Sequence, residues 1–134
     1  MFDVLLHQAN PDWNQIIESY ANNCSCFVIY NQQYIRGEKT IRLTDLSIDE
    51  YKEIASDHAE ELTQFVYENK NEIHPEYGKP WKDIHNITQW GITDFSLRKL
   101  MNSLGFKEVF YENHGMFINL PAFEEHAFIF MKDE

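Results

Sequence analysis

The segment FKEVFYENHGMFINLPAFEEHAFIFM, residues 106–131, decides the fold class that the sequence predicts. Residues 106–111 and 116–120 carry aromatic and β-branched side chains, and they flank ENHG at 112–115, a turn composition whose glycine suits a positive φ angle. Residues 126–131 show a third strand pattern. We therefore expect a C-terminal β-meander.

The segment upstream of the meander predicts a helix that leads into it. Residues 95–103 follow Thr93 and Asp94, either of which can cap a helix, and Gly105 suits a left-handed C-cap. Near the N-terminus, residues 10–12 (NPD) are typical of a helix start, with a capping asparagine, proline in the first turn and an acid at the positive end of the helix dipole.

Two further strand patterns complete the predicted sheet. Residues 24–30 are apolar and β-branched, residues 39–43 alternate polar and apolar side chains, and a turn at 31–33 would let residues 34–36 pair back. These elements predict an α+β fold, in which an antiparallel sheet of about five to six strands packs against about three helices. Residues 1–134 are the size of a single globular domain.

A long helix is predicted in the middle of the chain. Ser47 and Glu50 form a capping box, and the pattern after them favours a helix of about 22 residues. Its apolar stripe comprises Ile48, Tyr51, Ile54, Ala55, His58, Leu62, Phe65 and Val66.

Acidic residues are concentrated on the other side of this predicted helix. Residues 45–76 hold ten carboxylates against two lysines, which gives −8 of the net charge of −11. Like charges four residues apart destabilise an isolated helix by roughly 0.2–0.5 kcal/mol per pair. A solvated face that keeps the protein soluble and a binding face for a cationic partner both remain open, and the concentration of the acids favours binding. The acids of this predicted face are Asp49, Glu53, Asp57, Glu60 and Glu61.

Composition and motifs narrow the classes of function. The acidic balance argues against nucleic acid and anionic membranes as ligands, and it favours fast, salt-sensitive association with a basic protein. No signal peptide or membrane-spanning run is evident, so we expect a cytoplasmic protein. No cofactor fingerprint occurs, and none is expected to bind. Cys24 and Cys26 are interpreted as reduced, buried thiols rather than as a disulfide or metal site.

Six histidines suggest a metal or acid–base site, although no pair has the i, i+4 spacing of a helical zinc site. His58 lies on the apolar stripe and is interpreted as a core residue. His74, His85 and His114 fall in predicted loops, and whether they converge with Tyr77 in a pocket stays open.

The sequence LMNSLGFK at 100–107, followed by EVF at 108–110 and FMKD at 130–133, resembles the C-terminal end of small N-acetyltransferases. In that family a helix leads through a Leu-Gly-Phe turn into the last two strands, which the resemblance implies for about a quarter of this chain. The family's glycine-bearing pyrophosphate loop has no counterpart, because residues 39–43 lead into TDLS at 44–47. The chain is therefore not assigned to that family.

These observations predict a binding protein rather than an enzyme. We expect a monomeric inhibitor of a basic protein, of the kind exemplified by bacterial immunity proteins that cover the cationic site of a nuclease-type toxin. The acids would contact lysines and arginines, while Tyr77 and Trp81 from the aromatic loop at 74–90 would anchor the interface. The alternatives are an acidic secretion-type chaperone, or a small N-acetyltransferase-like enzyme that uses the loop histidines.

Overall fold

The chain folds as an α+β protein, as predicted. The computed structural model describes residues 1–55, 58–85, 87–116 and 119–134. The α-helices in these ranges are α1 (Trp13–Ala21), α2 (Ile48–Ile54), α3 (Glu60–Asn69) and α4 (Asp94–Ser103). The 3₁₀ helices are η1 (Leu5–His7), η2 (Leu43–Asp45) and η3 (Trp81–Asp83). The strands are β1 (Cys26–Tyr34), β2 (Ile41–Arg42), β3 (Trp90–Gly91), β4 (Phe106–Met116) and β5 (Phe123–Lys132). Across the ranges described, no helix combines the length and apolar character needed to cross a membrane.

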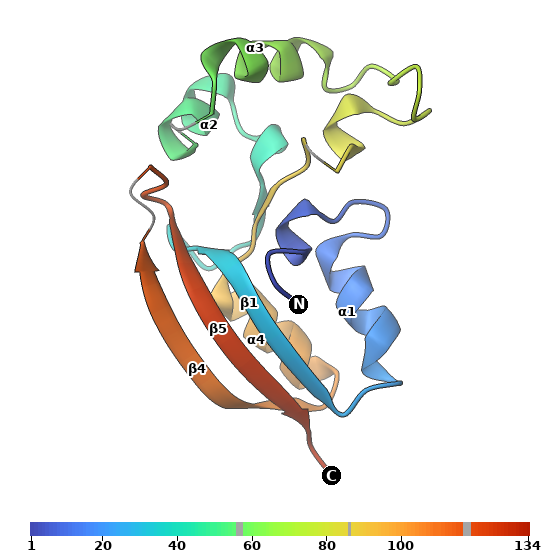
Figure 1. Cartoon of the computed structure of the whole chain (residues 1–134), viewed down its shortest axis with the longest axis vertical. Coiled ribbons are helices and arrows are strands. Elements are labelled where there is room, and N and C mark those ends of the chain that lie inside the picture. The colour runs from blue at the N-terminus through green and yellow to red at the C-terminus, as the bar shows by residue number, and fades with distance from the viewer. Residues whose placement is uncertain (56–57, 86, 117–118) are drawn as a thin grey trace.

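The described strands form two antiparallel sheets rather than the one sheet of five to six strands that we expected. β1, β5 and β4 pair in that order, so that His126 of β5 faces Asn31 on one side and Asn113 on the other. β2 and β3 pair separately through two residues each. Figure 1 shows the three long strands curving around α4 and α1, which lie against one face.

The turn predicted at residues 31–33 is wrong, because β1 continues through it to Tyr34. Asn31 and Gln33 point inward, where the Asn31 Nδ2 donates a hydrogen bond to Gln33 Oε1 at 2.8 Å. Gln33 Nε2 in turn donates to Asp94 Oδ1 at 3.0 Å. Polar side chains whose N–H groups find acceptors can occupy a strand interior. Their composition is nevertheless typical of a turn, which explains the wrong prediction.

The turn predicted at residues 112–115 is wrong as well. β4 continues to Met116, and a shift in its register with β5 between Asn113 and Met116 accommodates Gly115 at a φ of 95°. The predicted three-stranded meander is therefore a hairpin of β4 and β5 with β1 on the far side. Residues 117–118 of the strand predicted at 116–120 lie outside the described ranges.

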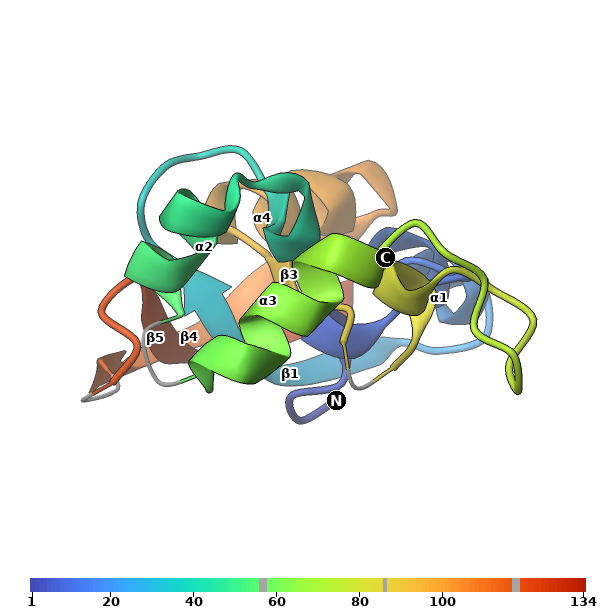
Figure 2. The ribbon, with the colours of Figure 1, turned by 90° about the horizontal axis from the view of Figure 1, so that it is seen from above.

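Two hydrophobic clusters hold these elements together. The larger lies between the three-stranded sheet and the helices α1 and α4, and it includes Ile17, Leu97, Phe128 and Phe130. The smaller, centred on Phe123, lies beneath α2 and η2 at the other end of the molecule. Figure 2 shows α2 and α3 stacked over this second end.

The second face of the three-stranded sheet is left open, and we call it the open face. Val28, Phe110 and Met131 lie on it, and each side chain is between 43% and 48% exposed. Cys26 is also exposed there, so the prediction of a buried thiol is wrong for this residue, while Cys24 is half-buried. Both cysteines are free.

The predicted cap of α4 at Thr93 is correct, whereas the asparagine cap predicted for α1 is wrong. Asp12, rather than Asn10, is the N-cap of α1. The backbone N–H of Asp12 donates to Gln15 Oε1 at 2.8 Å. The Thr93 hydroxyl accepts a hydrogen bond from the Ser96 N–H at 3.1 Å, which fixes the start of α4. α4 then passes through Gly105 into β4, the helix–turn–strand arrangement that the Leu-Gly-Phe pattern implies.

The single helix of about 22 residues predicted after Ser47 is wrong, because the chain breaks it into α2 and α3. The capping box of Ser47 and Glu50 starts α2 as predicted, and hydrogen bonds from Ser47 lower the pKa of Glu50. α2 ends where Ala55 is buried in the smaller cluster. The break lets two short helices cover one compact end of the molecule, and it relieves the repulsion of a four-residue acid repeat.

A buried histidine links β5 to α4. Only 4% of His126 is exposed, and its ring lies between two carboxylates. Its Nδ1 is 2.8 Å from Asp94 Oδ1 and its Nε2 is 2.7 Å from Glu124 Oε2. Burial works against the charged ring, but the hydrogen bonds to both carboxylates raise the pKa of His126. Burial likewise works against the Asp94 carboxylate, yet bonds from His126 and Gln33 lower its pKa. The two groups therefore favour a charged, paired state.

Glu125, on the opposite face of β5, gives a pH prediction. Burial, with a smaller contribution from Asp3, raises the pKa of Glu125 to about 7 in the folded protein. Its Oε2 has no hydrogen-bond partner among the residues that the structure describes. A raised carboxyl pKa favours folding at low pH, and this contribution is lost as pH rises from the unfolded value of about 4.3 through 7. We expect E125Q and the wild type to unfold at similar urea concentrations at pH 4.5, and E125Q to resist urea better at pH 8. Equal midpoints at pH 8 would contradict this assignment.

Candidate functional site

Helix α3 is positioned by its inner face, which packs onto the rest of the molecule. Val66 is buried, and the Tyr67 hydroxyl donates to the Leu43 carbonyl at 3.0 Å. Burial raises the pKa of Tyr67, so the hydroxyl stays protonated and remains a donor. Lys70 Nζ donates to the Thr44 carbonyl at 2.6 Å. The outer face of α3 is therefore held toward solvent.

That outer face combines acids with an aromatic ring. Glu61, Phe65 and Glu68 are spaced four and three residues apart, which places them on one side of the helix. Phe65 is 43% exposed between the two carboxylates. These residues, with Glu60 and Gln64, line an open hollow of about 380 Å³.

The aromatic loop at 74–90 lies against this face. The Trp81 ring meets Phe65 edge-to-face, with centroids 5.1 Å apart, and it lies 4.3 Å from the His74 ring. His74 also packs against Tyr77 at 4.8 Å, and Tyr77 is 59% exposed. We call Glu60, Glu61, Phe65, Glu68, Tyr77 and Trp81 the acidic–aromatic face.

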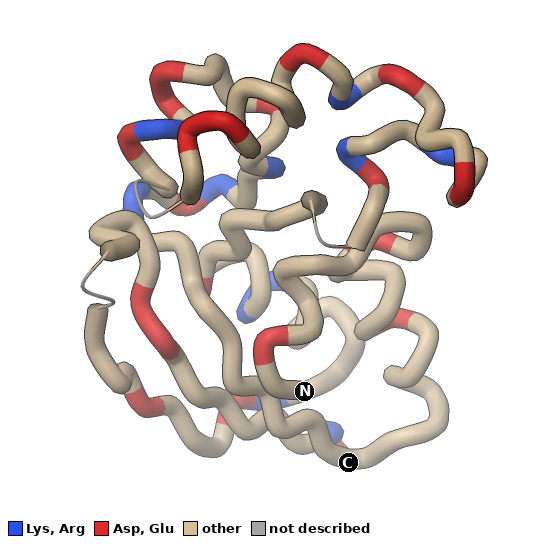
Figure 3. Tube along the Cα trace, turned by 45° about the horizontal axis from the view of Figure 1, so that its top comes forward, with Lys and Arg blue, Asp and Glu red and all other residues tan. Residues whose placement is uncertain are grey.

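The structure thus brings part of the predicted site together. Glu60 and Glu61 share α3 with the ring that Trp81 contacts, although Trp81 is half-buried and clamps the loop, while Tyr77 is the more exposed ring. Figure 3 shows acidic residues recurring along α2, α3 and the loop that follows.

The rest of the predicted acid row is arranged differently. Asp49 and Glu53 lie exposed on α2, so the break separates them from Glu61, and Asp57 lies outside the described residues. Two of the acids have basic neighbours. Arg36 Nη1 is 3.6 Å from Glu53 Oε1, and Lys52 Nζ is 3.3 Å from Glu60 Oε1. Both pairs are exposed, so each neutralises charge while adding little stability.

Phe65 is the site residue that sequence reasoning missed. A continuous helix from Ser47 would put Phe65 and Leu62 on the buried stripe. Because the chain restarts at Glu60, the buried positions of α3 become Thr63 and Val66, and Phe65 turns outward. The four-residue spacing of Phe65 from Glu61 indicates that the two residues share one side of a helix. Which side faces solvent depends on where the second helix begins, and the sequence did not indicate that.

The histidines are dispersed. His74 packs in the aromatic loop. The ring of His85 lies beside that of His7, with centroids 5.4 Å apart. His114 of β4 packs against Tyr30 of β1, with ring centroids 5.5 Å apart. His58, expected in the core, is half-buried, with its Nδ1 2.7 Å from the Tyr51 hydroxyl. Within the described ranges, no group of three or more histidine, cysteine or acidic residues is arranged to hold a metal ion.

Comparison with known proteins does not assign the chain to a family. The chain matches no protein-family model, and searches of curated proteins and of solved structures find no significant similarity.

Proposed function

We propose that the chain is an inhibitor of a basic protein, an immunity protein that covers the cationic site of a nuclease-type toxin. The observation that supports this most is the acidic–aromatic face, where Glu61 and Glu68 lie on either side of the exposed ring of Phe65. Carboxylates attract lysine and arginine, and an exposed aromatic ring provides a surface on which a guanidinium can stack.

The acidic and the aromatic residues would contribute to different steps of binding. The net charge of −11 steers a basic protein toward the molecule, and this attraction weakens as salt increases. Tyr77 and Phe65 would then be desolvated in the interface and slow dissociation. The break after α2 contributes as well, because it presents Glu61 on a short helix whose other side is anchored.

A pull-down from the host with the tagged chain, eluted by a salt gradient, tests this proposal. We expect one basic protein, released as ionic strength rises. A chain that retains no basic protein in low salt would contradict the proposal.

Tyr77 is expected to be an interface anchor that the fold does not need. Because the ring is exposed, we expect Y77A to weaken binding of that basic protein by roughly 2 kcal/mol while changing the free energy of unfolding by less than about 0.5 kcal/mol. Tyr20, a tyrosine of similar exposure on α1, offers the matched control Y20A. Calorimetric titration of both variants checks the prediction, and equal affinities for them would place the interface elsewhere.

A secretion-type chaperone is the second candidate, and the open face favours it. Such a chaperone needs apolar surface for an unfolded client or for its own dimer, and Val28, Phe110 and Met131 supply it. Light scattering after size-exclusion chromatography separates the two candidates. A monomer supports the inhibitor, and a dimer broken by M131E supports the chaperone.

A further inference from the structure

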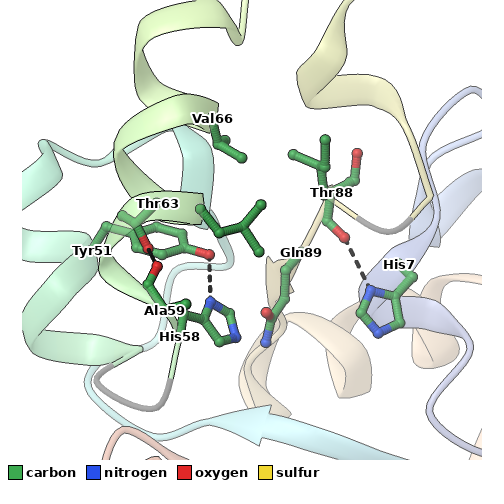
Figure 4. A pocket seen from close by; sticks show the side chains of 10 residues that line it. His7, Tyr51, His58, Ala59, Thr63, Val66, Thr88 and Gln89 are labelled. Atoms are coloured by element: carbon green, nitrogen blue, oxygen red, sulfur yellow. Dashed lines mark hydrogen bonds between the residues drawn. The ribbon is translucent and has the colours of Figure 1, made fainter.

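A pocket of about 330 Å³ lies on the side of α3 opposite the acidic–aromatic face. Val66 of α3 and Ile87 contribute apolar walls, Leu62 lies at the exposed edge, and His7, His58 and Gln89 contribute polar groups. Figure 4 shows these side chains approaching from α3 on one side and from η1 and the 87–89 segment on the other. The volume is at the lower end of the range of small-molecule sites.

Gln89 is the residue that points to a ligand. It is 93% buried, since only 7% of it is exposed, and its backbone carbonyl accepts from the Leu43 N–H at 2.9 Å. Among the described residues, its side-chain amide has no hydrogen-bond partner. Figure 4 shows the amide directed into the space between His58 and His7. The amide thus opens into the pocket, where an occupant that offers both a donor and an acceptor can pair with it.

His7 has a defined hydrogen-bonding state in this pocket. Its Nδ1 lies 3.0 Å from the Thr88 carbonyl oxygen, which can only accept, so Nδ1 carries the proton. Nε2 is then the ring nitrogen that can accept a hydrogen bond. His58 is held on the opposite wall by its contact with the Tyr51 hydroxyl.

The lining residues also exclude one class of ligand. None of them is a lysine or arginine, and the chain carries a net charge of −11, so phosphates and carboxylates would enter an unfavourable field. We propose that this pocket binds a small uncharged heterocycle with an N–H donor beside a carbonyl acceptor, as in a nucleobase. The adjacent groups pair with the Gln89 amide, a second N–H donates to His7 Nε2, and the ring packs against Val66 and Ile87. This proposal does not depend on the inhibitor function.

Titration with uracil, followed by ¹H–¹⁵N correlation spectra, tests the proposal. We expect saturable shifts of the Gln89 side-chain amide and of the Thr63 and Val66 backbone signals. The matched probe is 1,3-dimethyluracil, which keeps the ring and carbonyls but lacks both N–H donors, and we expect it to bind at least 10-fold more weakly. Equal binding of the two probes, or shifts elsewhere only, would overturn the proposal. No shift with uracil would mean that water alone fills the pocket, and would overturn it too.

Variants make the test specific to the pocket. We expect Q89L to lower uracil affinity at least 10-fold, while Q64L, a glutamine exposed on the other side of α3, leaves it unchanged. Since Q89L alters a buried position, L62W serves as a second variant, because it places a bulky ring at the exposed edge without touching the core. Unchanged uracil binding in folded L62W would overturn the proposal.

Discussion

Reversing the charge of Glu61 and Glu68 is expected to lower affinity for the basic partner roughly 100-fold, or about 2.7 kcal/mol, because each new lysine faces the partner's cations. The fold should remain intact. Both side chains are exposed on α3, and surface substitutions of this kind usually change the free energy of unfolding by less than about 0.5 kcal/mol. Isothermal titration of E61K/E68K against the wild type measures the change.

The control for this prediction must change net charge equally at another place. Glu18 on α1 and Glu134 at the C-terminus are both exposed and lie outside the acidic–aromatic face. We expect E18K/E134K to lose only the small, salt-sensitive part of the affinity that depends on net charge. If both double variants bind equally well, the α3 acids are a solvated surface that serves solubility.

Removing the Asp94 carboxylate is expected to cost roughly 3–5 kcal/mol of folding free energy, the usual cost of breaking a buried ion pair. Asp94 Oδ1 and Oδ2 lie 2.8 and 2.9 Å from His126 Nδ1, and Gln33 also donates to this carboxylate. In D94A, His126 loses this carboxylate and keeps its contact with Glu124. Since typical domains are stable by only 5–15 kcal/mol, the loss should be plain in urea unfolding followed by circular dichroism.

Two further measurements make this prediction specific. The pKa of His126, followed through its ring protons by NMR, should fall in D94A because a hydrogen-bonded carboxylate has gone. E108A is the control, because Glu108 accepts from Arg98 Nε at 2.7 Å in a more exposed pair, which is worth at most about 1 kcal/mol. Similar losses of stability in D94A and E108A would show that the buried histidine is not held as described.

The sequence predicts a structural feature correctly where that feature depends only on contacts between residues close together in the chain. The Thr93 cap, the turn at Gly105 and the capping box at Ser47 all form as predicted, because each depends on atoms within a few residues. The turns predicted at residues 31–33 and 112–115 are wrong. Their polar composition is typical of turns, and only the packing of β5 between β1 and β4 shows that strands pass through them.

The site was predictable in part for the same reason. The acids and the two loop aromatics could be named from composition, and α3 does bring Glu60 and Glu61 near the loop that carries Tyr77 and Trp81. The exposed position of Phe65 depends on the break before Glu60, which resets the helical phase. At the end of α2, Ala55 packs in the smaller cluster, a tertiary contact that residue spacing does not encode.

The pocket beside Gln89 was beyond sequence reasoning altogether. Its polar groups come from η1, from His58 just before α3 and from the segment that ends the aromatic loop, which are separated by dozens of residues. No motif connects them, and a buried glutamine becomes informative only once its missing partner is visible.

Inhibition of the recovered basic protein is the measurement that tests the central claim most directly. The purified chain is titrated into a nuclease assay of that protein, alongside E61K/E68K at the same concentrations. We predict that nuclease activity is lost at about one equivalent of the wild-type chain and persists with the variant. Undiminished nuclease activity with the wild type, or equal inhibition by both chains, would contradict it.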